Sequence, residues 1–244
     1  MSWAQALEGS TPSFGIAFMP KPKLPDKDFK WTPKLTYAIG LLTTDGNLSG
    51  DGRHLTMRSS DTQLLKTFKG CLNLSTKISQ SKNDGWATKP SYRVQFGDVQ
   101  FYRWLLKIGL FPAKTYTIGK IEVPDIYFRD FLRGHLDGDG SISTYKDYYN
   151  TYKSPKYIYV RLWVKFISMS KNHIIWLREK IYKLIQIKGH LIQAKNYHSD
   201  KIPGMTILKF GKKESTKLLK WIYYKKNLPC LFRKHKIAEK FLKP

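Results

Sequence analysis

The sequence has few of the residues that build disulfide frameworks or zinc centres. Its two cysteines, Cys71 and Cys230, are too few for either structure on their own. Its six histidines include no pair at the i,i+4 spacing that places two ligands on one helical face. These absences argue against a zinc hydrolase and a histidine-centred nuclease, and they lead us to expect a reducing compartment.

Long apolar runs are also absent. No stretch of about 18 apolar residues occurs, so no membrane-spanning helix is expected. Residues 1–30 lack the basic start, apolar stretch and small-residue cleavage site of a secretory signal. That stretch instead holds several prolines, and we interpret residues 1–33 as an extended N-terminal arm.

Acidic residues are scarce. Asp and Glu together number 18 against 43 Lys and Arg, which gives a net charge of +25 and a pI near 9.9. A globular protein tolerates such self-repulsion more easily when its partner is a polyanion. Nucleic acid is therefore the first candidate partner and an anionic membrane surface the second. The seven Trp residues argue for a packed globular protein rather than a disordered one.

The chain repeats itself. Segments 38–46 (AIGLLTTDG) and 132–140 (LRGHLDGDG) share a pattern in which a glycine precedes an Asp-Gly pair. A strand pattern ends near Met57 after the first segment and near Ile167 after the second, and an amphipathic helix pattern follows each. Two more strands and another helix follow in both copies. Each half therefore predicts the order α-β-β-α-β-β-α in an α+β fold.

Residues 115–125 are predicted to link the two copies, because a glycine and a proline punctuate this stretch. The first repeat is then 34–114 and the second is 126–244, which ends in a short basic helix. We expect Asp125 to act as the N-cap of the second motif helix.

The motif glycines predict where the two acidic residues lie. A glycine inside a helix costs about 1 kcal/mol relative to alanine, so Gly40 and Gly134 need a reason. Close approach of two helices is that reason, and helices packed there would bring Asp45 and Asp139 together. Two unpaired carboxylates that close repel unless cations lie between them. Oxygen ligands select hard ions such as Mg²⁺.

Both segments resemble the LAGLIDADG motif, most closely at residues 131–141 (FLRGHLDGDGS). The resemblance covers about residues 34–235 and implies a LAGLIDADG homing endonuclease of the single-chain, two-motif form. It implies a saddle of antiparallel sheets over duplex DNA, with the motif helices at the interface between the repeats.

The resemblance also implies roles for the motif residues. Asp45 and Asp139 are implied to bind metal and to catalyse, with the preceding residues Thr44 and Gly138 as further ligands. About two or three Mg²⁺ ions are expected, and Mn²⁺ or Ca²⁺ can substitute in binding. The earlier motif acid is present in the second copy, as Asp137. Position 43 of the first copy is a threonine, so the two sites are unequal if that acid has a chemical role.

The family places a lysine near each site. By its position after the third helix, Lys114 fits the first copy. Lys234 fits the second copy, and Arg233 is the alternative there.

Strand alternation predicts the side chains that face DNA. Arginine and glutamine on such a surface suit the edges of guanine and adenine in the major groove. The predicted residues are His54, Thr56, Arg58, Arg93 and Gln95 in the first repeat, and Tyr145, Arg161, Trp163, Lys165, Gln193, Lys195, Tyr197 and Lys209 in the second.

The second repeat has a longer first hairpin, in which residues 145–157 add tyrosines and lysines. We expect this hairpin to lengthen the DNA footprint on one flank. A mobile loop without function is the competing interpretation.

The expected activity is hydrolysis of both strands of a long asymmetric duplex site by an intron- or intein-encoded monomer. The DNA-containing compartment is then a bacterial cytoplasm or an organelle. Two alternatives share the fold: an RNA maturase acting on its host intron, and a catalytically inactive DNA-binding regulator. The intact acids disfavour the inactive regulator and do not exclude the maturase.

Overall fold

A computed structural model describes residues 27–81, 90–194 and 204–242. The first half contains α1 (Pro33–Thr44), β1 (Gly46–Leu48), β2 (His54–Ser59), α2 (Thr62–Leu72), β3 (Ser79–Gln80), β4 (Tyr92–Gly97) and α3 (Val99–Lys107). The second half contains the short 3-10 helix η1 (Asp125–Tyr127), α4 (Phe128–Asp137), β5 (Ser141–Asp147), β6 (Tyr159–Ser168), α5 (Lys171–Ile185), β7 (His190–Gln193), β8 (Thr206–Phe210), α6 (Lys212–Ile222) and the basic C-terminal α7 (Phe232–Leu242). The predicted repeat of helices and strands is confirmed.

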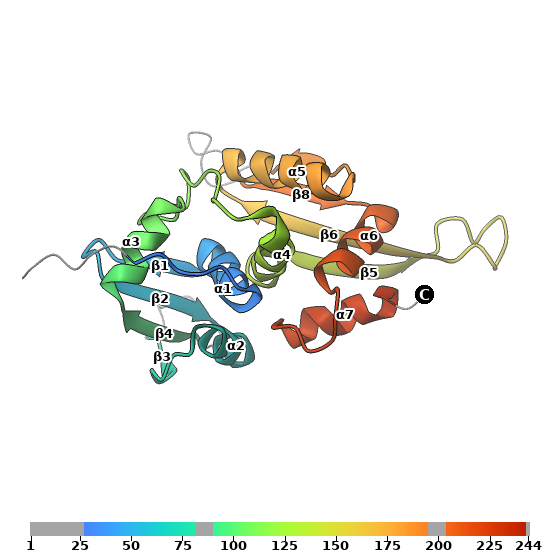
Figure 1. Cartoon of the computed structure of the whole chain (residues 1–244). Coiled ribbons are helices and arrows are strands. Elements are labelled where there is room, and N and C mark those ends of the chain that lie inside the picture. The colour runs from blue at the N-terminus through green and yellow to red at the C-terminus, as the bar shows by residue number, and fades with distance from the viewer. Residues whose placement is uncertain (1–26, 82–89, 195–203, 243–244) are drawn as a thin grey trace, which may run out of the picture.

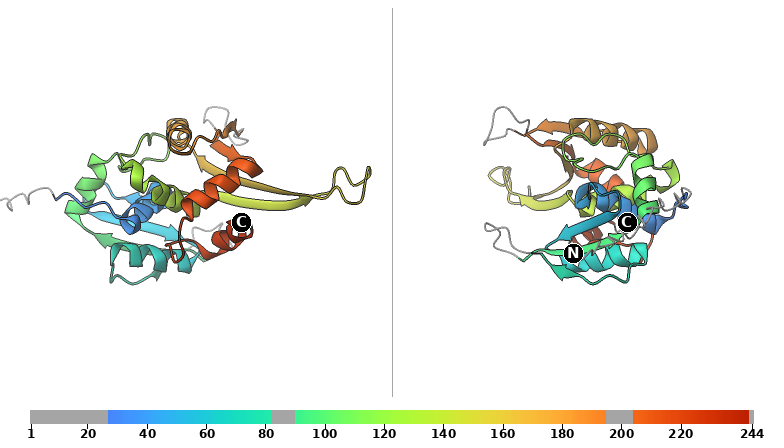
Figure 2. Two further views of the ribbon diagram at one scale, coloured as in Figure 1. Left: turned by 45° about the vertical axis from the view of Figure 1, so that its right-hand side comes forward. Right: turned by 90° about the vertical axis from the view of Figure 1, so that its left-hand side faces the viewer.

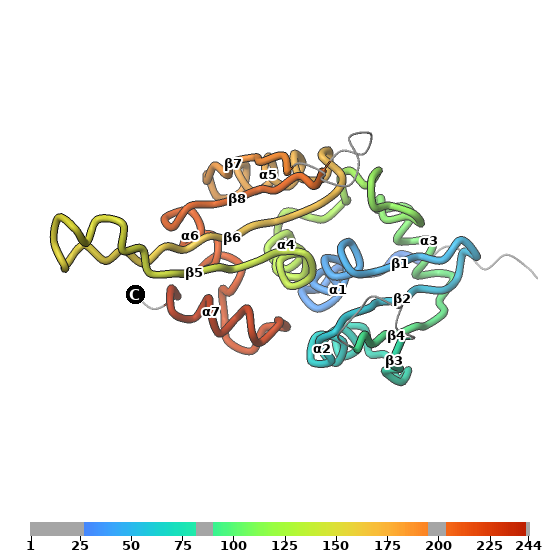
Figure 3. Tube along the Cα trace, turned by 180° about the vertical axis from the view of Figure 1, so that it is seen from behind, coloured from blue at the N-terminus to red at the C-terminus, as the bar shows by residue number. Residues whose placement is uncertain are grey.

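Each half builds one antiparallel sheet of four strands. The strand orders are β1-β2-β4-β3 and β5-β6-β8-β7, so the two sheets have the same topology. The two halves lie side by side with α1 and α4 between them (Figure 1). Strands of both sheets line one side of the molecule and helices the other (Figure 2, right; Figure 3). This two-layer arrangement leaves one face of each sheet free for a partner.

Helix α1 forms where the sequence provides both a cap and an apolar core. The Thr32 hydroxyl accepts a hydrogen bond from the Leu35 backbone N–H at 3.1 Å, and Pro33 occupies the first turn, where its missing N–H costs nothing. Residues 36–43 are then buried without interruption, because α1 packs against α4 on one side and against its own sheet and α2 on the other.

The two motif glycines lie at the closest contact between α1 and α4, as predicted. A Cβ added to Gly40 would clash with the Phe131 carbonyl oxygen and lie 3.0 Å from the Gly134 Cα. A Cβ added to Gly134 would clash with the Tyr37 carbonyl oxygen. The backbones of the two helices therefore touch, and only glycine fits at either position.

One prediction about the linker is wrong. Asp125 does not cap the second motif helix, because the η1 turn lies between them and Tyr127 occupies the N-cap position without a side-chain hydrogen bond. The Asp125 carboxylate instead pairs with Lys180 and Lys183 on α5. These lysines hold the pKa of Asp125 below its ordinary value. Asp125 thus ties the linker to α5.

The long hairpin of the second repeat extends beyond the body of the molecule (Figure 2, left). Strand pairing continues to Asp147 and Tyr159, and residues 148–158 form the tip. The tip is rich in exposed aromatic rings, including Tyr149, which is 79% exposed, and Tyr152, which is 73% exposed.

Among the described residues, no helix combines the length and apolar character needed to cross a bilayer.

The packing of α1 on α4 predicts the effect of enlarging the motif glycines. Gly40→Leu or Gly134→Leu should lower the melting temperature, because the side chain would force two backbones apart at a cost of about 1–3 kcal/mol or more. Gly70→Leu on α2 is the matched control. A Cβ there meets no atom within 4 Å, so its melting temperature should stay level or rise. Equal melting temperatures for all three variants would contradict the proposed contact.

Candidate functional site

The two motif acids emerge together at the end of the helix pair. Asp45 is the C-cap of α1, and Asp139 follows the C-cap of α4, Gly138. A Cβ on Gly138 would lie 2.8 Å from the Asp45 Oδ2 and would collide with the Thr44 hydroxyl. The turn that carries Asp139 therefore lies directly against Asp45, and the glycine is required for this approach.

Burial and neighbouring charges shift the pKa of both carboxylates. Burial, and then the negative charge of Asp139, raise the pKa of Asp45 to about 7. Burial also raises the pKa of Asp139 above its ordinary value. Lys234 and Lys114 act in the opposite direction on both acids. Two acids and two lysines thus form one electrostatic cluster, drawn from both repeats. Among the described residues, no set of three or more His, Cys, Asp or Glu side chains is arranged to hold a metal ion.

The two lysines are held differently. Lys234 Nζ lies 2.6–3.0 Å from four carbonyl oxygens, those of Leu136, Asp137, Gly138 and Gly140. An ammonium has only three N–H groups, so all of its donors are used. These carbonyls include the ones left free at the end of α4, and Lys234 satisfies them as a cationic cap.

Lys114 makes the pseudo-symmetric contact and no more. Within the described parts of the chain, its ammonium donates only to the carbonyl of Gly46, the residue after Asp45. Both lysines are buried, and burial lowers the pKa of each to about 8. At neutral pH both are therefore still mostly cationic, but only Lys114 has N–H groups to spare.

The earlier motif acid has a structural environment. Asp137 is buried, and its Oδ2 accepts hydrogen bonds from the Tyr37 hydroxyl and the Leu231 backbone N–H, each at 2.8 Å. Burial raises its pKa to about 6 despite these bonds. The equivalent Thr43 donates instead to the Ile39 carbonyl of its own helix. Asp137 thus joins α4 to α1 and to the start of α7, a link that Thr43 does not make.

The predicted DNA-facing residues of the first sheet lie where strand alternation put them, with one exception. Arg58 and Arg93 are direct partners across β2 and β4, so two like charges stand side by side on the open face. Thr56 lies opposite Gln95 but is only 8% exposed, because its neighbours on both sides cover it. His54 is held by Asp51 in the preceding turn.

The open face of the second sheet carries a ladder of rings and cations. Tyr145 lies beside Trp163, with ring centroids 5.2 Å apart, and the Lys209 ammonium sits 3.9 Å above the Trp163 ring. Lys165 and Lys209 are direct partners across β6 and β8, a second pair of like charges. Repulsion within such pairs costs free energy unless a polyanion lies between them.

Other predicted contacts are altered or lie elsewhere. Arg161 pairs with Asp147, with its Nη2 2.7 Å from a carboxylate oxygen, so it is not free to read a base in this state. Gln193 accepts a hydrogen bond from the Thr206 hydroxyl at 2.9 Å. Lys195 and Tyr197 lie outside the described residues.

Two buried polar clusters that include residues of α4 were not predicted. Arg133 is fully buried, and it pairs with Asp130 at 2.7 Å. His173 Nδ1 lies 2.7 Å from the Gly119 carbonyl and must carry the proton, so His173 Nε2 accepts from His135 Nε2 at 3.1 Å. Burial lowers the pKa of both histidines, to about 4 for His173. Scattered single residues of this kind leave no periodic signal in a sequence.

Comparison with known proteins rests on structure. No protein-family model matches the sequence, and no curated protein matches it. The structure resembles the LAGLIDADG homing endonuclease I-LtrWI bound to target DNA, at 12% identity and a TM-score of 0.54, covering 85% of this chain and 89% of that one. It also resembles the homing endonuclease I-WcaI bound to its DNA recognition sequence, at 13% identity and a TM-score of 0.55, covering 85% and 88% of the two chains.

A third similar structure is full-length WhiA from Thermatoga maritima, at 14% identity and a TM-score of 0.50. The match covers 88% of this chain and 62% of that one. WhiA is not named as an endonuclease, so the shared architecture alone does not assign an activity. The repeat, the glycine-mediated helix contact and the coverage of both halves nevertheless agree with the sequence resemblance. This chain has the fold of the single-chain, two-motif LAGLIDADG homing endonucleases.

Proposed function

We propose that this protein is a metal-dependent endonuclease that hydrolyses both strands of a long asymmetric duplex DNA site. One observation carries the proposal. Asp45 and Asp139 meet at the ends of two pseudo-symmetric helices, between two lysines and beside two open, cationic sheet faces. DNA lying across the sheets would present one phosphate of each strand near this cluster.

The residues present fit divalent cations. Burial disfavours the ionised form of both Asp45 and Asp139, and the charge of Asp139 further disfavours that of Asp45. A hard dication between the two carboxylates would stabilise their ionised forms. Asp45, Asp139 and the backbone carbonyls of Thr44 and Gly138 are the oxygen donors that would hold Mg²⁺. The Gly138 carbonyl already accepts from Lys234 at 3.0 Å, so a metal there would share this oxygen.

The chemistry divides among the residues as follows. Bound Mg²⁺ would activate water and stabilise charge on the phosphate and the leaving oxygen. Asp45 and Asp139 would hold the metal ions in place and orient the water network. Lys114 has N–H groups free to donate to a phosphate oxygen or an attacking water, whereas Lys234 fixes the turn that carries Asp139. We therefore assign direct contact with reacting atoms to Lys114 before Lys234.

The open sheet faces would hold the duplex. The Arg58–Arg93 and Lys165–Lys209 pairs each gain most from a polyanion placed between them. Phosphate contacts of this kind set the register of the protein on DNA, and side chains such as Gln95 would read base edges. An intron RNA partner remains a prediction of the sequence resemblance.

DNA binding without cleavage is the second candidate, since WhiA has the same architecture. Cleavage of a randomised duplex library in Mg²⁺, with sequencing of the new ends and an EDTA control, separates the two candidates. Enrichment of one long site with breaks in both strands supports the endonuclease. Retained binding of a selected site without breaks would instead support the regulator.

Removing either acid should abolish cleavage. Asp45→Asn and Asp139→Asn each keep the shape of the side chain but lose an anionic ligand, so double-strand cutting in Mg²⁺ should fall by about 100-fold or more while DNA affinity changes little. Glu179→Gln on α5, an exposed acid far from the cluster in sequence, is the control for lost negative charge. Near-normal cutting by either Asn variant would refute the site.

The raised pKa of Asp45 predicts a pH-dependent gain in stability when its charge is removed. The folded-state pKa of about 7 exceeds the ordinary value of 3.8, so ionisation between these values costs the native state stability as pH rises. Asp45→Asn in a chelator should therefore melt a few degrees above the unmodified protein at pH 8 and no higher at pH 4. Scanning calorimetry at both pH values tests this sign, and a variant less stable at pH 8 would contradict it.

The extended hairpin predicts an asymmetric footprint. Replacing residues 148–158 by a two-residue Asn-Gly turn should weaken binding and shorten protection on one flank of the site, because the exposed tyrosines and lysines of the tip would be lost. Cleavage position should not change. Hydroxyl-radical footprinting over a protein titration measures the affinity and the length of the protected site. Protection of unchanged length would show that the tip does not contact DNA.

A further inference from the structure

The segment that delivers Lys234 to the site is gripped by side chains of both repeats. Residues 229–233, which we call the C-terminal strap, are the last part of the connection between α6 and α7 together with the first two residues of α7. From the second repeat, Arg133 Nε donates to the Pro229 carbonyl at 2.8 Å. The Leu231 backbone N–H donates to Asp137 at 2.8 Å. Two buried charged residues of α4 thus bind the backbone of the strap.

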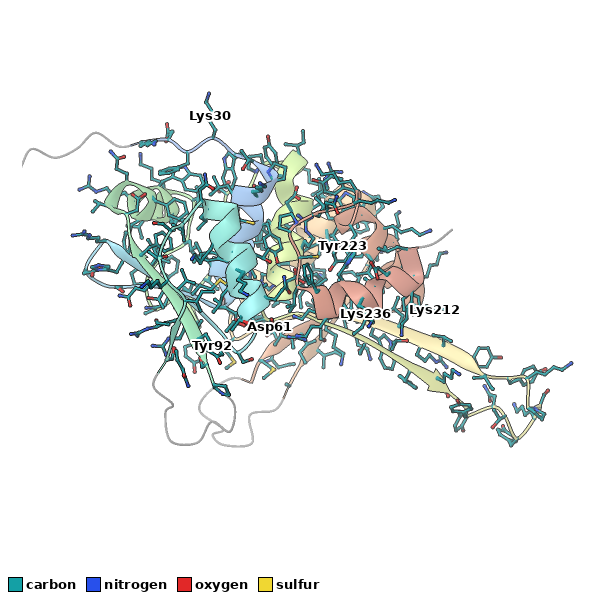
Figure 4. All side chains as sticks on the ribbon, turned by 90° about the horizontal axis from the view of Figure 1, so that it is seen from below. Lys30, Asp61, Tyr92, Lys212, Tyr223 and Lys236 are labelled. Atoms are coloured by element: carbon teal, nitrogen blue, oxygen red, sulfur yellow. The ribbon has the colours of Figure 1, made fainter. Side chains whose placement is uncertain are left out.

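The first repeat grips the same segment from the other side. Gln63, on the first turn of α2, donates from Nε2 to the Cys230 carbonyl at 3.0 Å and accepts at Oε1 from the Phe232 backbone N–H at 2.9 Å. One side-chain amide therefore satisfies a backbone acceptor and a backbone donor that flank Leu231. A longer contact between Asp61 and Arg233, at 3.4 Å, lies beside it. Figure 4 shows α2, marked by Asp61, beside α7, marked by Lys236.

The grip has a geometric consequence for Lys234. The Lys234 backbone N–H bonds to the Leu231 carbonyl at 3.0 Å, so the residue held between the two grips also starts the first turn of α7. That turn aims the Lys234 side chain inward, where its ammonium meets the four carbonyls at the end of α4. The position of the ammonium is thus fixed through the strap.

We infer that Gln63 is a positioning residue: by holding the C-terminal strap, α2 of the first repeat places the Lys234 ammonium against the carbonyls of the turn that carries Asp139. The role of Lys234 there rests on the proposed function, but the position of its ammonium does not. Lys114 reaches the same cluster from the segment that follows α3, and its hydrogen bond is to the Gly46 carbonyl rather than to the strap or the end of α4. The two lysines therefore differ in what controls them.

Amine labelling of the full-length protein in the absence of DNA tests this inference. Both Lys234 and Lys114 are buried, so both should react slowly with a succinimidyl acetate reagent, and mass spectrometry follows each one separately. In Gln63→Ala, labelling of Lys234 should accelerate by about tenfold or more, because the strap can then open locally, while Lys114 keeps its protection. Gln63→Glu keeps the acceptor for Phe232 and loses the donor to Cys230, so its effect on Lys234 should be intermediate.

Lys66→Ala, an exposed position on the same helix, is the matched control and should leave both lysines protected. Unchanged labelling of Lys234 in Gln63→Ala would overturn the inference. Equal acceleration of Lys234 and Lys114 would also overturn it, because that result would mean a general loosening rather than release of the strap. Neither result depends on cleavage, so a failure of the proposed nuclease activity would be recognised separately in the library assay.

Discussion

The contact between the backbones of α1 and α4 is the constraint on which the rest of the structure depends. Gly40 and Gly134 allow two helices from different repeats to touch without side chains between them. The same approach brings the helix ends so close that Gly138 lies against Asp45. The packing of the two helices and the meeting of the two acids therefore have one cause.

Charge is arranged in this protein at the expense of its own stability. Two acids crowd each other at the helix ends, and like-charged pairs face each other on both sheets. None of these contacts stabilises the isolated chain. All of them would become favourable with cations between the acids and a polyanion across the sheets. Since the protein carries a net charge of +25, this pattern is the strongest electrostatic support for a nucleic-acid partner.

The two repeats share a topology but have diverged around the site. Asp137 joins three elements where Thr43 bonds only within its helix. All N–H groups of the Lys234 ammonium donate to backbone carbonyls, whereas the Lys114 ammonium makes one such bond. The second sheet also carries the long hairpin (Figure 1). A single chain permits this divergence because each repeat is encoded separately and can change without the other.

The sequence by itself determined the repeat, the order of the elements and the meeting of Asp45 with Asp139, because periodic apolar residues and paired glycines leave a local signature. The sequence also located the basic C-terminal helix. It wrongly predicted Asp125 as the N-cap of α4 and Thr56 as a residue of the open sheet face, where Thr56 is in fact buried. Only the tertiary structure decided that Lys234 is saturated by carbonyls, that Arg133 is buried, and that Gln63 holds the strap. These contacts join side chains to backbone groups across long stretches of chain, and backbone groups are the same at every residue, so no pattern of residue types records them.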